Sequence, residues 1–184
     1  MDYHALRRKM ITINQLKQIM PHARSKVILY AEPLADAMDE FDIDTPQRQA
    51  AFLAQVAVES GELRYVEELA SGEAYEGRAD LGNTESGDGK RFKGRGLIQI
   101  TGRANYESCG AALGLDLLAN PEYLESPANA CRSAAWFWKS RGLNELADAG
   151  NFRKITIKIN GGIGKHTHYE DRLAYWETAK EAIA

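Results

Sequence analysis

Glycine is unevenly distributed along this chain, and its distribution constrains the fold more than any other feature. Half of the 16 glycines lie between residues 61 and 96, mixed with many charged residues. Clusters of glycine and polar residues favour turns and interrupt both helices and long strands. We therefore expect a loop-rich lobe over about residues 62–104, with no more than a short β-hairpin, and helices on either side of it.

Apolar residues recur at helical spacing outside this lobe. The clearest helix begins after Thr45, a good N-cap, with Pro46 at its first position, and it ends before Gly61. The sequence thus predicts a mainly α fold, with a helical core, a small lobe and a cleft between them. Further helices, the second of them kinked or broken at Pro33, are expected over residues 12–20, 24–40, 126–141, 151–159 and 169–183.

Length and composition are those of one soluble globular domain. The chain has 184 residues, of which 44% are hydrophobic and 27% charged, and its net charge is −3. This charge argues against nucleic acid as the main partner. Cys109 and Cys131 have no metal-ligand spacing and are expected to be buried thiols, although a disulfide between them is left open.

The sequence contains no evident targeting or membrane segment. The residues after Arg7, Arg8 and Lys9 turn polar too soon for a signal peptide. No apolar run approaches the ~18 residues of a membrane span. We therefore expect synthesis in the cytoplasm and no insertion into a membrane.

Glu59 is the first candidate for acid–base chemistry. It lies on an apolar stripe with Phe52 and Val56, at positions i, i+4 and i+7 of the expected helix. Partial desolvation of a carboxyl group there favours its protonated form, which a general acid requires. The alternative is a carboxylate at the helix end that is turned to water.

A second carboxylate, Glu68, follows the expected helix break at Ser60 and Gly61. The break lets the chain turn back, so that Glu68 can face Glu59 across a cleft. Two facing carboxyl groups are the minimum set for glycoside hydrolysis, because one protonates the leaving oxygen and the other activates water or attacks the sugar. The assignment of Glu68 is less specific because other acids lie near it in the sequence, and most of these are expected to be solvated: Glu62, Glu67, Glu73 and Glu76.

Residues 97–101 alternate in polarity with the period of a short strand. The strand would place Gln99 and Thr101 on one face, while Ile98 and Ile100 point to the core. The glycines just before it permit close backbone approach. They do not form a phosphate-binding loop, because the GxxxxGK[ST] pattern is absent.

Three other groups have both a functional and a structural interpretation. Asn160 precedes two glycines and either belongs to a tight turn or presents its amide to a sugar. His166, His168 and Asp171 are favoured as exposed polar residues over a metal site, and we expect neither a metal nor another cofactor. The tryptophans of residues 126–141 are expected in the core rather than stacked on sugars.

These strings together resemble glycoside hydrolase family 19, the chitinase-like family that includes many phage endolysins. The similarity runs from about residue 47 to residue 172. It is carried by residues 52–61 (FLAQVAVESG), 75–83 (YEGRADLGN), 92–103 (FKGRGLIQITGR), then Asn105 and Tyr106, and 159–162 (INGG). The string GRGLIQIT is quite specific, whereas Glu-Ser-Gly alone is not.

The resemblance implies a lysozyme-like fold and hydrolysis by single-displacement inversion. Matched by position, Glu59 is the general acid, Glu68 the second carboxylate, and Thr101 the hydroxyl that helps hold the attacking water. Positions that bind the substrate or organise its site are matched by Gln99, Asn105, Tyr106, Asn160 and Arg172. Of these, Arg172 corresponds to a C-terminal arginine that organises the acidic site.

One position departs from the family pattern, because Val58 stands where a histidine usually precedes the acid. The resemblance implies one catalytic domain over residues 1–184, without a separate wall-binding module. The expected function is that of an endolysin, a monomer that hydrolyses β-1,4 bonds in the glycan strands of peptidoglycan. Such an enzyme reaches the cell wall after the membrane has been permeabilised, and it causes host cell lysis.

Three other functions remain as alternatives. A chitinase would cut the same β-1,4 linkage in chitin. A lytic transglycosylase needs only one catalytic carboxylate and releases 1,6-anhydro sugars. A wall-binding protein without activity is disfavoured, because binding alone does not need a proton donor such as Glu59 together with Glu68.

Overall fold

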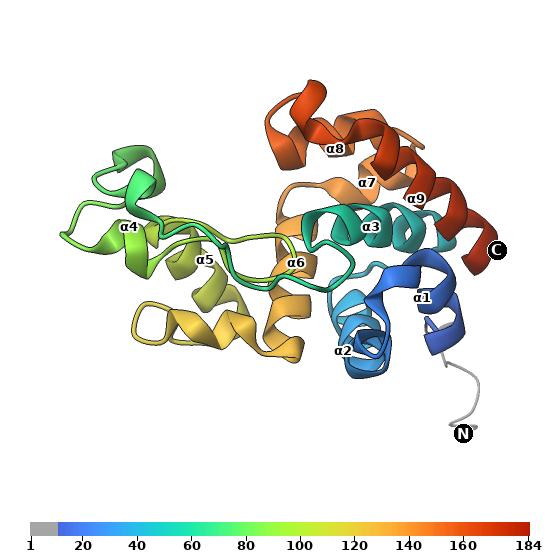
Figure 1. Cartoon of the computed structure of the whole chain (residues 1–184), viewed down its shortest axis with the longest axis horizontal. Helices are drawn as coiled ribbons and strands as arrows, with labels where there is room; N and C mark the ends of the chain where they lie inside the picture. Colours follow the sequence, from blue (N-terminus) through green and yellow to red (C-terminus); the bar gives the residue numbers. More distant parts are fainter. Residues whose placement is uncertain (1–10) are drawn as a thin grey trace.

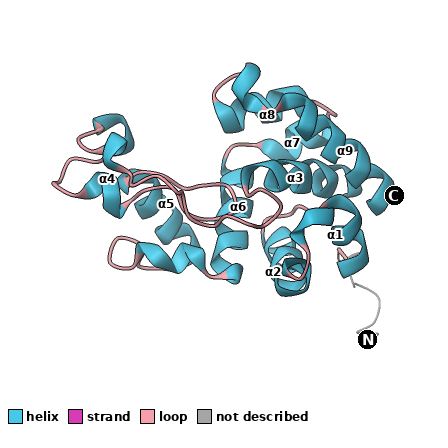
Figure 2. Ribbon diagram, viewed as in Figure 1, coloured by secondary structure: helices cyan, strands magenta, loops and turns pink. Residues whose placement is uncertain are grey.

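The structure, a computed structural model, describes residues 11–184, so the basic residues 7–9 lie outside the described part. Helices dominate the described residues (Figure 2), which confirms the predicted mainly α fold. The α-helices are α1 (Ile13–Ile19), α2 (Lys26–Glu40), α3 (Pro46–Glu59), α4 (Asp88–Arg91), α5 (Arg103–Leu113), α6 (Pro127–Ser140), α7 (Leu143–Asp148), α8 (Phe152–Asn160) and α9 (Tyr169–Ile183). Short 3-10 turns occupy Pro21–Ala23, Glu73–Tyr75, Ala79–Leu81, Pro121–Glu125 and Lys165–Thr167. Between residues 11 and 184, no helix has the length and apolar character needed to cross a bilayer.

Helix α3 is the centre of the helical core. The Thr45 side chain accepts a hydrogen bond from the backbone N–H of Arg48, and Pro46 opens the helix, as the sequence predicts. Helices α1, α7 and α9 pack around α3 (Figure 1), and its middle residues are buried. The Phe52 ring meets Trp138 of α6 edge-on, with 5.4 Å between ring centroids. The end of α3, where Glu59 lies, is therefore held from several directions.

Two extended segments connect this core with the lobe that contains α4 and α5 (Figure 1). They run side by side, because the backbone N–H of Gly96 donates to the Val66 carbonyl and that of Glu68 to the Gly94 carbonyl, both at 2.9 Å. Within residues 11–184 the β pairing consists of isolated bridges, Glu67 with Arg95 and Arg95 with Ile100. The expected hairpin is thus reduced to these bridges.

The strand expected over residues 97–101 is a tight turn instead. Arg95 and Ile100 exchange two backbone hydrogen bonds across it, of 3.1 and 2.8 Å. Gly96 permits the reversal with a φ of +90°, and a Cβ atom there would lie 2.6 Å from the Ser133 hydroxyl oxygen. Leu97 is therefore buried together with both isoleucines, although the strand pattern placed it on the polar face.

Helix α2 also differs from its prediction. It begins at Lys26 rather than residue 24, because Arg24 has a φ of +54° and cannot continue a right-handed helix. It then runs through Pro33 without the expected break; residues on both sides of the proline are buried, and α2 packs against α6. Helix α7, which was not expected, begins after Gly142.

Buried residues of α5 and α6 complete the core. Cys109 and Cys131 are free and buried, as expected, and burial raises the pKa of the Cys109 thiol to about 12. Both thiols therefore pack as small apolar groups. Trp138 is fully buried, and its indole N–H donates to Asn144 Oδ1 at 2.8 Å.

A buried polar network around Asp88 stabilises the lobe. Its carboxylate accepts hydrogen bonds from Arg103 Nε at 2.8 Å, from Arg103 Nη2 at 2.6 Å and from the backbone N–H of Glu85 at 3.0 Å. The Arg103 guanidinium holds the pKa of Asp88 below its usual range. Asn83 is buried beside them and joins the Tyr75 carbonyl to the backbone N–H of Arg103. These hydrogen bonds hold together the segments of the lobe, in which α4 is only four residues long.

Replacing Asp88 by asparagine is expected to lower the free energy of unfolding by about 2 kcal/mol at neutral pH, because Arg103 loses its buried carboxylate partner and keeps only the exposed Glu85. The pKa of Asp88 is lowered in the folded state, so its contribution is complete above the unfolded pKa of about 3.9. It disappears as the pH falls through the lower folded value. Urea unfolding of parent and variant across this range measures the difference, and a difference that persists unchanged in strong acid contradicts the assignment.

Candidate active site

Glu59 lies at the C-terminal end of α3 and pairs with an arginine from the far end of the chain. Arg172 Nη2, on α9, donates to Glu59 Oε1 at 2.6 Å. The Glu59 side chain is 21% exposed and that of Arg172 only 3%. Among the described side chains, the other donor to this carboxylate is Asn160 Nδ2, and it also approaches Oε1, at 3.5 Å. Oxygen Oε2 is therefore the one that can reach a substrate.

The Arg172 guanidinium is buried but well supplied with acceptors. It donates to the Gln55 side-chain oxygen, to the Thr167 carbonyl at 2.8 Å and to Asn160 Oδ1 at 3.3 Å, besides Glu59. Gln55 in turn donates to the Thr156 hydroxyl at 2.9 Å. A buried charge is tolerated only when it is paired and hydrogen-bonded in this way. The network therefore fixes the position of Glu59 relative to α8 and α9.

A second contact repeats this arrangement three residues further along both segments. The Tyr175 hydroxyl donates to Glu62 Oε1 at 2.5 Å, and the backbone N–H of His22 donates to Glu62 Oε2 at 2.6 Å. Burial and the Glu62 carboxylate raise the pKa of the Tyr175 hydroxyl well above its usual range, so it remains a donor. Helix α9 is thus joined to the chain around Glu59 at two successive points.

Glu68 lies on the first of the two segments that connect core and lobe. Its Oε2 accepts from the backbone N–H of Gly94 and its Oε1 from the Tyr75 hydroxyl, both at 3.0 Å. Burial, together with Glu68, raises the pKa of Tyr75, which keeps that hydroxyl protonated. Both oxygens of Glu68 accept a hydrogen bond, which suits a base that works as a carboxylate.

Gln99 and Thr101 lie close to Gly94 and Asn105, respectively. A Cβ atom at Gly94 would be 2.6 Å from Gln99 Oε1, so only glycine lets this side chain lie over the peptide that holds Glu68. Asn105 Nδ2 donates to the Thr101 carbonyl at 2.7 Å. Both Gln99 and Thr101 are half-buried, and none of the side chains that the structure describes bonds the Thr101 hydroxyl. That hydroxyl can therefore bind water.

Tyr106 does not lie where the family resemblance suggested. It is fully buried, and burial raises the pKa of its hydroxyl. The hydroxyl donates to the Lys93 carbonyl at 2.6 Å and accepts from Arg95 Nη1 at 3.1 Å. Because its side chain has no solvent-accessible surface, Tyr106 does not contact a sugar. It stabilises the segment around Gly94 through the hydrogen bond to the Lys93 carbonyl.

The remaining expected residues have simple surroundings. Asn160 is exposed at the end of α8, and Gly161 follows it in the left-handed conformation that closes the helix. His168 Nδ1 lies 3.2 Å from Asp171 Oδ2, and both side chains are exposed. Within residues 11–184, no three His, Cys, Asp or Glu side chains are gathered as metal ligands.

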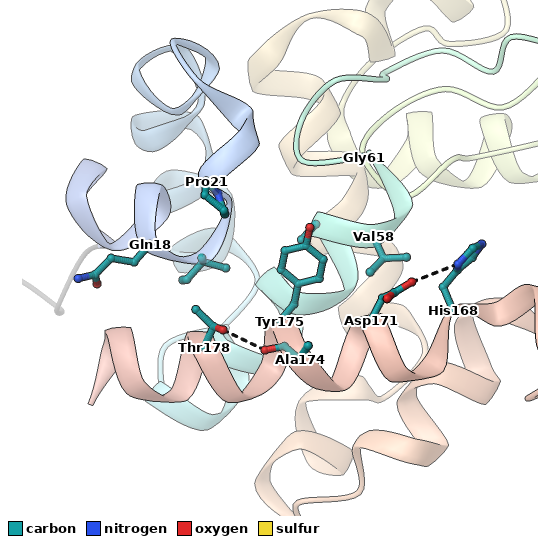
Figure 3. Close-up of a pocket in the computed structure, with 11 residues that line it drawn as sticks. Gln18, Pro21, Val58, Gly61, His168, Asp171, Ala174, Tyr175 and Thr178 are labelled. Carbon is teal, nitrogen blue, oxygen red and sulfur yellow. Dashed lines mark hydrogen bonds and ion pairs between the residues drawn. The ribbon is translucent and has the colours of Figure 1, made fainter.

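A cavity of about 530 Å³ lies between α1, α3 and α9, next to the site (Figure 3). Val58, at the position where the family pattern has histidine, lines this cavity with Tyr175 and Asp171. The lining includes neither Glu59 nor Glu68. Val58 is therefore an apolar residue in the lining of a cavity that does not include the two carboxylates.

The separate surroundings of Glu59 and Glu68 are compatible with the two roles that glycoside hydrolysis requires. Glu59 presents Oε2 from a rigid helix end, and Glu68 is held on a separate segment by two donors. One carboxyl group can therefore give a proton to a leaving oxygen while the other takes a proton from water. Thr101 supplies a hydroxyl without a protein partner among the described residues, which fits the water-holding role.

Sequence reasoning missed three polar residues that support this site: Tyr75, Gln55 and Thr156. Gln55 left a signal, because it is the only polar residue between positions 50 and 57 of a helix that is otherwise apolar there. A buried polar side chain needs a partner, and here that partner is Arg172. Tyr75 belongs to the string 75–83, but no pattern in the neighbouring residues predicts that its hydroxyl donates to Glu68.

A helical, lysozyme-like fold with two carboxylates on separate segments defines the class of a glycoside hydrolase. Comparison with known proteins agrees. The sequence model of the family described as Glyco_hydro_19, chitinase class I, matches residues 41–147, more than half of the chain. A glycosyl hydrolase family 19 domain-containing protein of Haemophilus influenzae is 30% identical over 186 residues, which cover 84% of this chain and 89% of that protein. The chain belongs to glycoside hydrolase family 19.

Other relatives extend the comparison. An endochitinase of Arabidopsis thaliana is 39% identical over 130 residues, 70% of this chain, but these make up only 44% of the plant protein. The crystal structure of a bacterial family 19 chitinase superposes with a TM-score of 0.78 at 25% identity and covers 95% of both chains. That of chitinase C from Streptomyces griseus superposes with a TM-score of 0.75 at 26% identity, covering 95% of this chain and 76% of that one.

Glu59→Gln is expected to lower turnover by roughly 10²–10⁴-fold, because the amide cannot deliver the proton while its oxygen still accepts from Arg172. Circular dichroism should show the parent fold. Glu40→Gln is the matched control, since Glu40 is also paired with an arginine, Arg132, at 2.7 Å. It should keep turnover near the parent value. A Glu59→Gln enzyme that works within a few-fold of the parent would show that another group is the acid.

Tyr75→Phe is expected to lower kcat about 10-fold with little change in KM, because Glu68 loses one of its two donors, a hydrogen bond to a charged group. Tyr123→Phe, at an exposed position on the 3-10 turn Pro121–Glu125, serves as control and should change neither constant. Steady-state kinetics on a soluble oligosaccharide separates the two. A loss that appears in KM alone, or equally in the control, speaks against the positioning role.

Proposed function

We propose that the chain is an endolysin that hydrolyses β-1,4 bonds in the glycan strands of bacterial peptidoglycan. The observation that carries the hydrolytic part is the pair Glu59 and Glu68, each held by its own donors on a separate segment. The choice of peptidoglycan rests on the nine-residue spacing between Glu59 and Glu68, which resembles the spacing typical of the endolysin branch of the family. We infer a monomer that works without a metal or cofactor.

The proposed mechanism is a single displacement. Glu59 protonates the glycosidic oxygen through Oε2, and the bond to the anomeric carbon breaks. Water held by Thr101 attacks the opposite face of the sugar, and Glu68 takes its proton. Gln99, Asn105 and Asn160 are assigned to contacts with sugar hydroxyl or acetamido groups. Arg172 keeps Glu59 in place without touching the substrate.

A place of action follows from this proposal. We infer that the enzyme is made in the cytoplasm of the host bacterium and reaches the wall once the membrane has been permeabilised. Host cell lysis is then the consequence of cutting the glycan strands.

Chitin is the second candidate substrate, and one observation favours it. The plant relative and the solved bacterial neighbours are named as chitinases. Chitin and peptidoglycan share the β-1,4 linkage between N-acetylated sugars, so the residues assigned above serve both. The two substrates differ in the peptides that only peptidoglycan carries.

Digestion of purified peptidoglycan, with mass spectrometry of the released fragments, tests the proposed function. We expect fragments with ordinary reducing ends, and NMR during the reaction should show the α-anomer first, because inversion of a β-linkage gives α product. Chitin oligomers are digested in parallel. Release of 1,6-anhydro sugars indicates a transglycosylase, initial β product indicates retention, and cleavage of chitin alone indicates a chitinase.

A further inference from the structure

A second cavity, of about 380 Å³, lies beside the chain that follows Glu59. Two segments line it, residues 22–26 before and at the start of α2 and residues 61–64 after α3. Its volume falls in the range typical of small-ligand sites. The lining side chains are largely polar: His22, Arg24, Ser25, Lys26, Glu62 and Arg64, with Ala23 and Gly61.

Positive charge is concentrated in this cavity although the whole chain is acidic, with a net charge of −3. Arg24, Lys26 and Arg64 come together here, and among residues 11–184 no carboxylate lies within salt-bridge distance of any of them. Lys26 Nζ donates to the Arg64 carbonyl at 3.1 Å, a bond that leaves its charge unbalanced. Arginines elsewhere in the described chain are commonly paired, as Arg132 is with Glu40.

The one acid in the lining, Glu62, offsets only one of these three positive charges and forms no ion pair with any of them. Glu62 is buried, and both of its oxygens are already occupied, by the Tyr175 hydroxyl and the backbone N–H of His22. Its function is to join the two lining segments to each other and to α9. The cavity is therefore a preformed space with a net positive charge, which attracts an anion.

The position of the cavity relates it to the substrate. Gly61, which lines it, is only two residues from Glu59. Gly61, Glu62 and Leu63 all have positive φ values, of +56°, +57° and +66°. Two of these residues are not glycine, so the tertiary contacts hold this loop in a costly conformation next to the acid. The cavity therefore borders the loop that directly follows Glu59 in the chain.

We propose that this cavity binds carboxylate groups of the peptides attached to peptidoglycan, and so distinguishes peptidoglycan from chitin. The inference rests on the proposed function, because it takes the glycan at Glu59 to be peptidoglycan. Chitin is uncharged and offers nothing to Arg24, Lys26 and Arg64. The peptides of peptidoglycan carry several carboxylates, and arginine binds carboxylates in a bidentate manner.

The kinetic test compares two forms of one polymer. Intact peptidoglycan and the same strands stripped of peptides by an amidase are offered to the parent and to the double variant Arg24→Gln/Arg64→Gln. We expect the variant to lose about 5- to 10-fold in kcat/KM on intact peptidoglycan, as for two solvent-accessible ion pairs, and to match the parent on stripped strands. Added salt should diminish the preference of the parent for the intact form.

The control is Arg153→Gln/Lys154→Gln, which removes two exposed charges from α8 and should leave the preference unchanged. An equal loss on both forms of the polymer, or none on either, overturns the proposal.

A binding test decides the matter independently of hydrolysis. NMR spectra of the parent are recorded with the free tetrapeptide, with its fully amidated analogue, with inorganic phosphate and with anionic phospholipid vesicles. We expect shifts at residues 22–26 and 61–64 with the carboxylate peptide that the amidated analogue and the double variant do not give. If the enzyme cleaves chitin alone, the proposed function fails, while this titration still shows whether the cavity recognises the peptide. Absence of peptide shifts, or stronger binding of phosphate or vesicles, overturns the proposal.

Discussion

The arrangement of the site depends on one buried cation. Arg172 is nearly inaccessible to solvent, and removing a guanidinium from water is costly unless every donor finds an acceptor. The acceptors come from α3, α8 and the turn before α9, so satisfying one charge fixes three parts of the fold. Glu59 contributes Oε1 to this network, and Oε2 has no donor among the described side chains.

The two carboxylates are held by different kinds of structure. Glu59 belongs to a helix that is buried along most of its length, and its position follows from the packing of this helix together with the hydrogen bond from Arg172. Glu68 lies in an extended segment, and its position follows from the backbone N–H of Gly94 and the Tyr75 hydroxyl. In the proposed mechanism, an acid at a helix end and a base on a connecting segment fit a reaction in which water must enter between them.

Local patterns predicted much of the fold but less of the site. Caps, prolines and glycines act within a few residues, so α1, α3, α6, α8 and α9 lie within about two residues of their expected bounds. The strand predicted for residues 97–101 was wrong. Alternating polarity is compatible with a strand, but it also occurs in this turn, where Gly96 lets the chain reverse direction. Tyr106 was misplaced, since matching a family position says nothing about burial.

The sequence by itself determined the mainly α fold and the irregular lobe, and it singled out Glu59 and Glu68 as the candidate carboxylates. Helix signals and glycine clusters are local, and the strings around Glu59 and residues 92–103 are specific enough to reveal the family. Only the tertiary structure decided what each carboxylate contacts. Arg172 reaches Glu59 across 113 residues, and Gly94 reaches Glu68 across 26. Pairings over such distances arise from the packing of whole helices and segments, which no local pattern encodes.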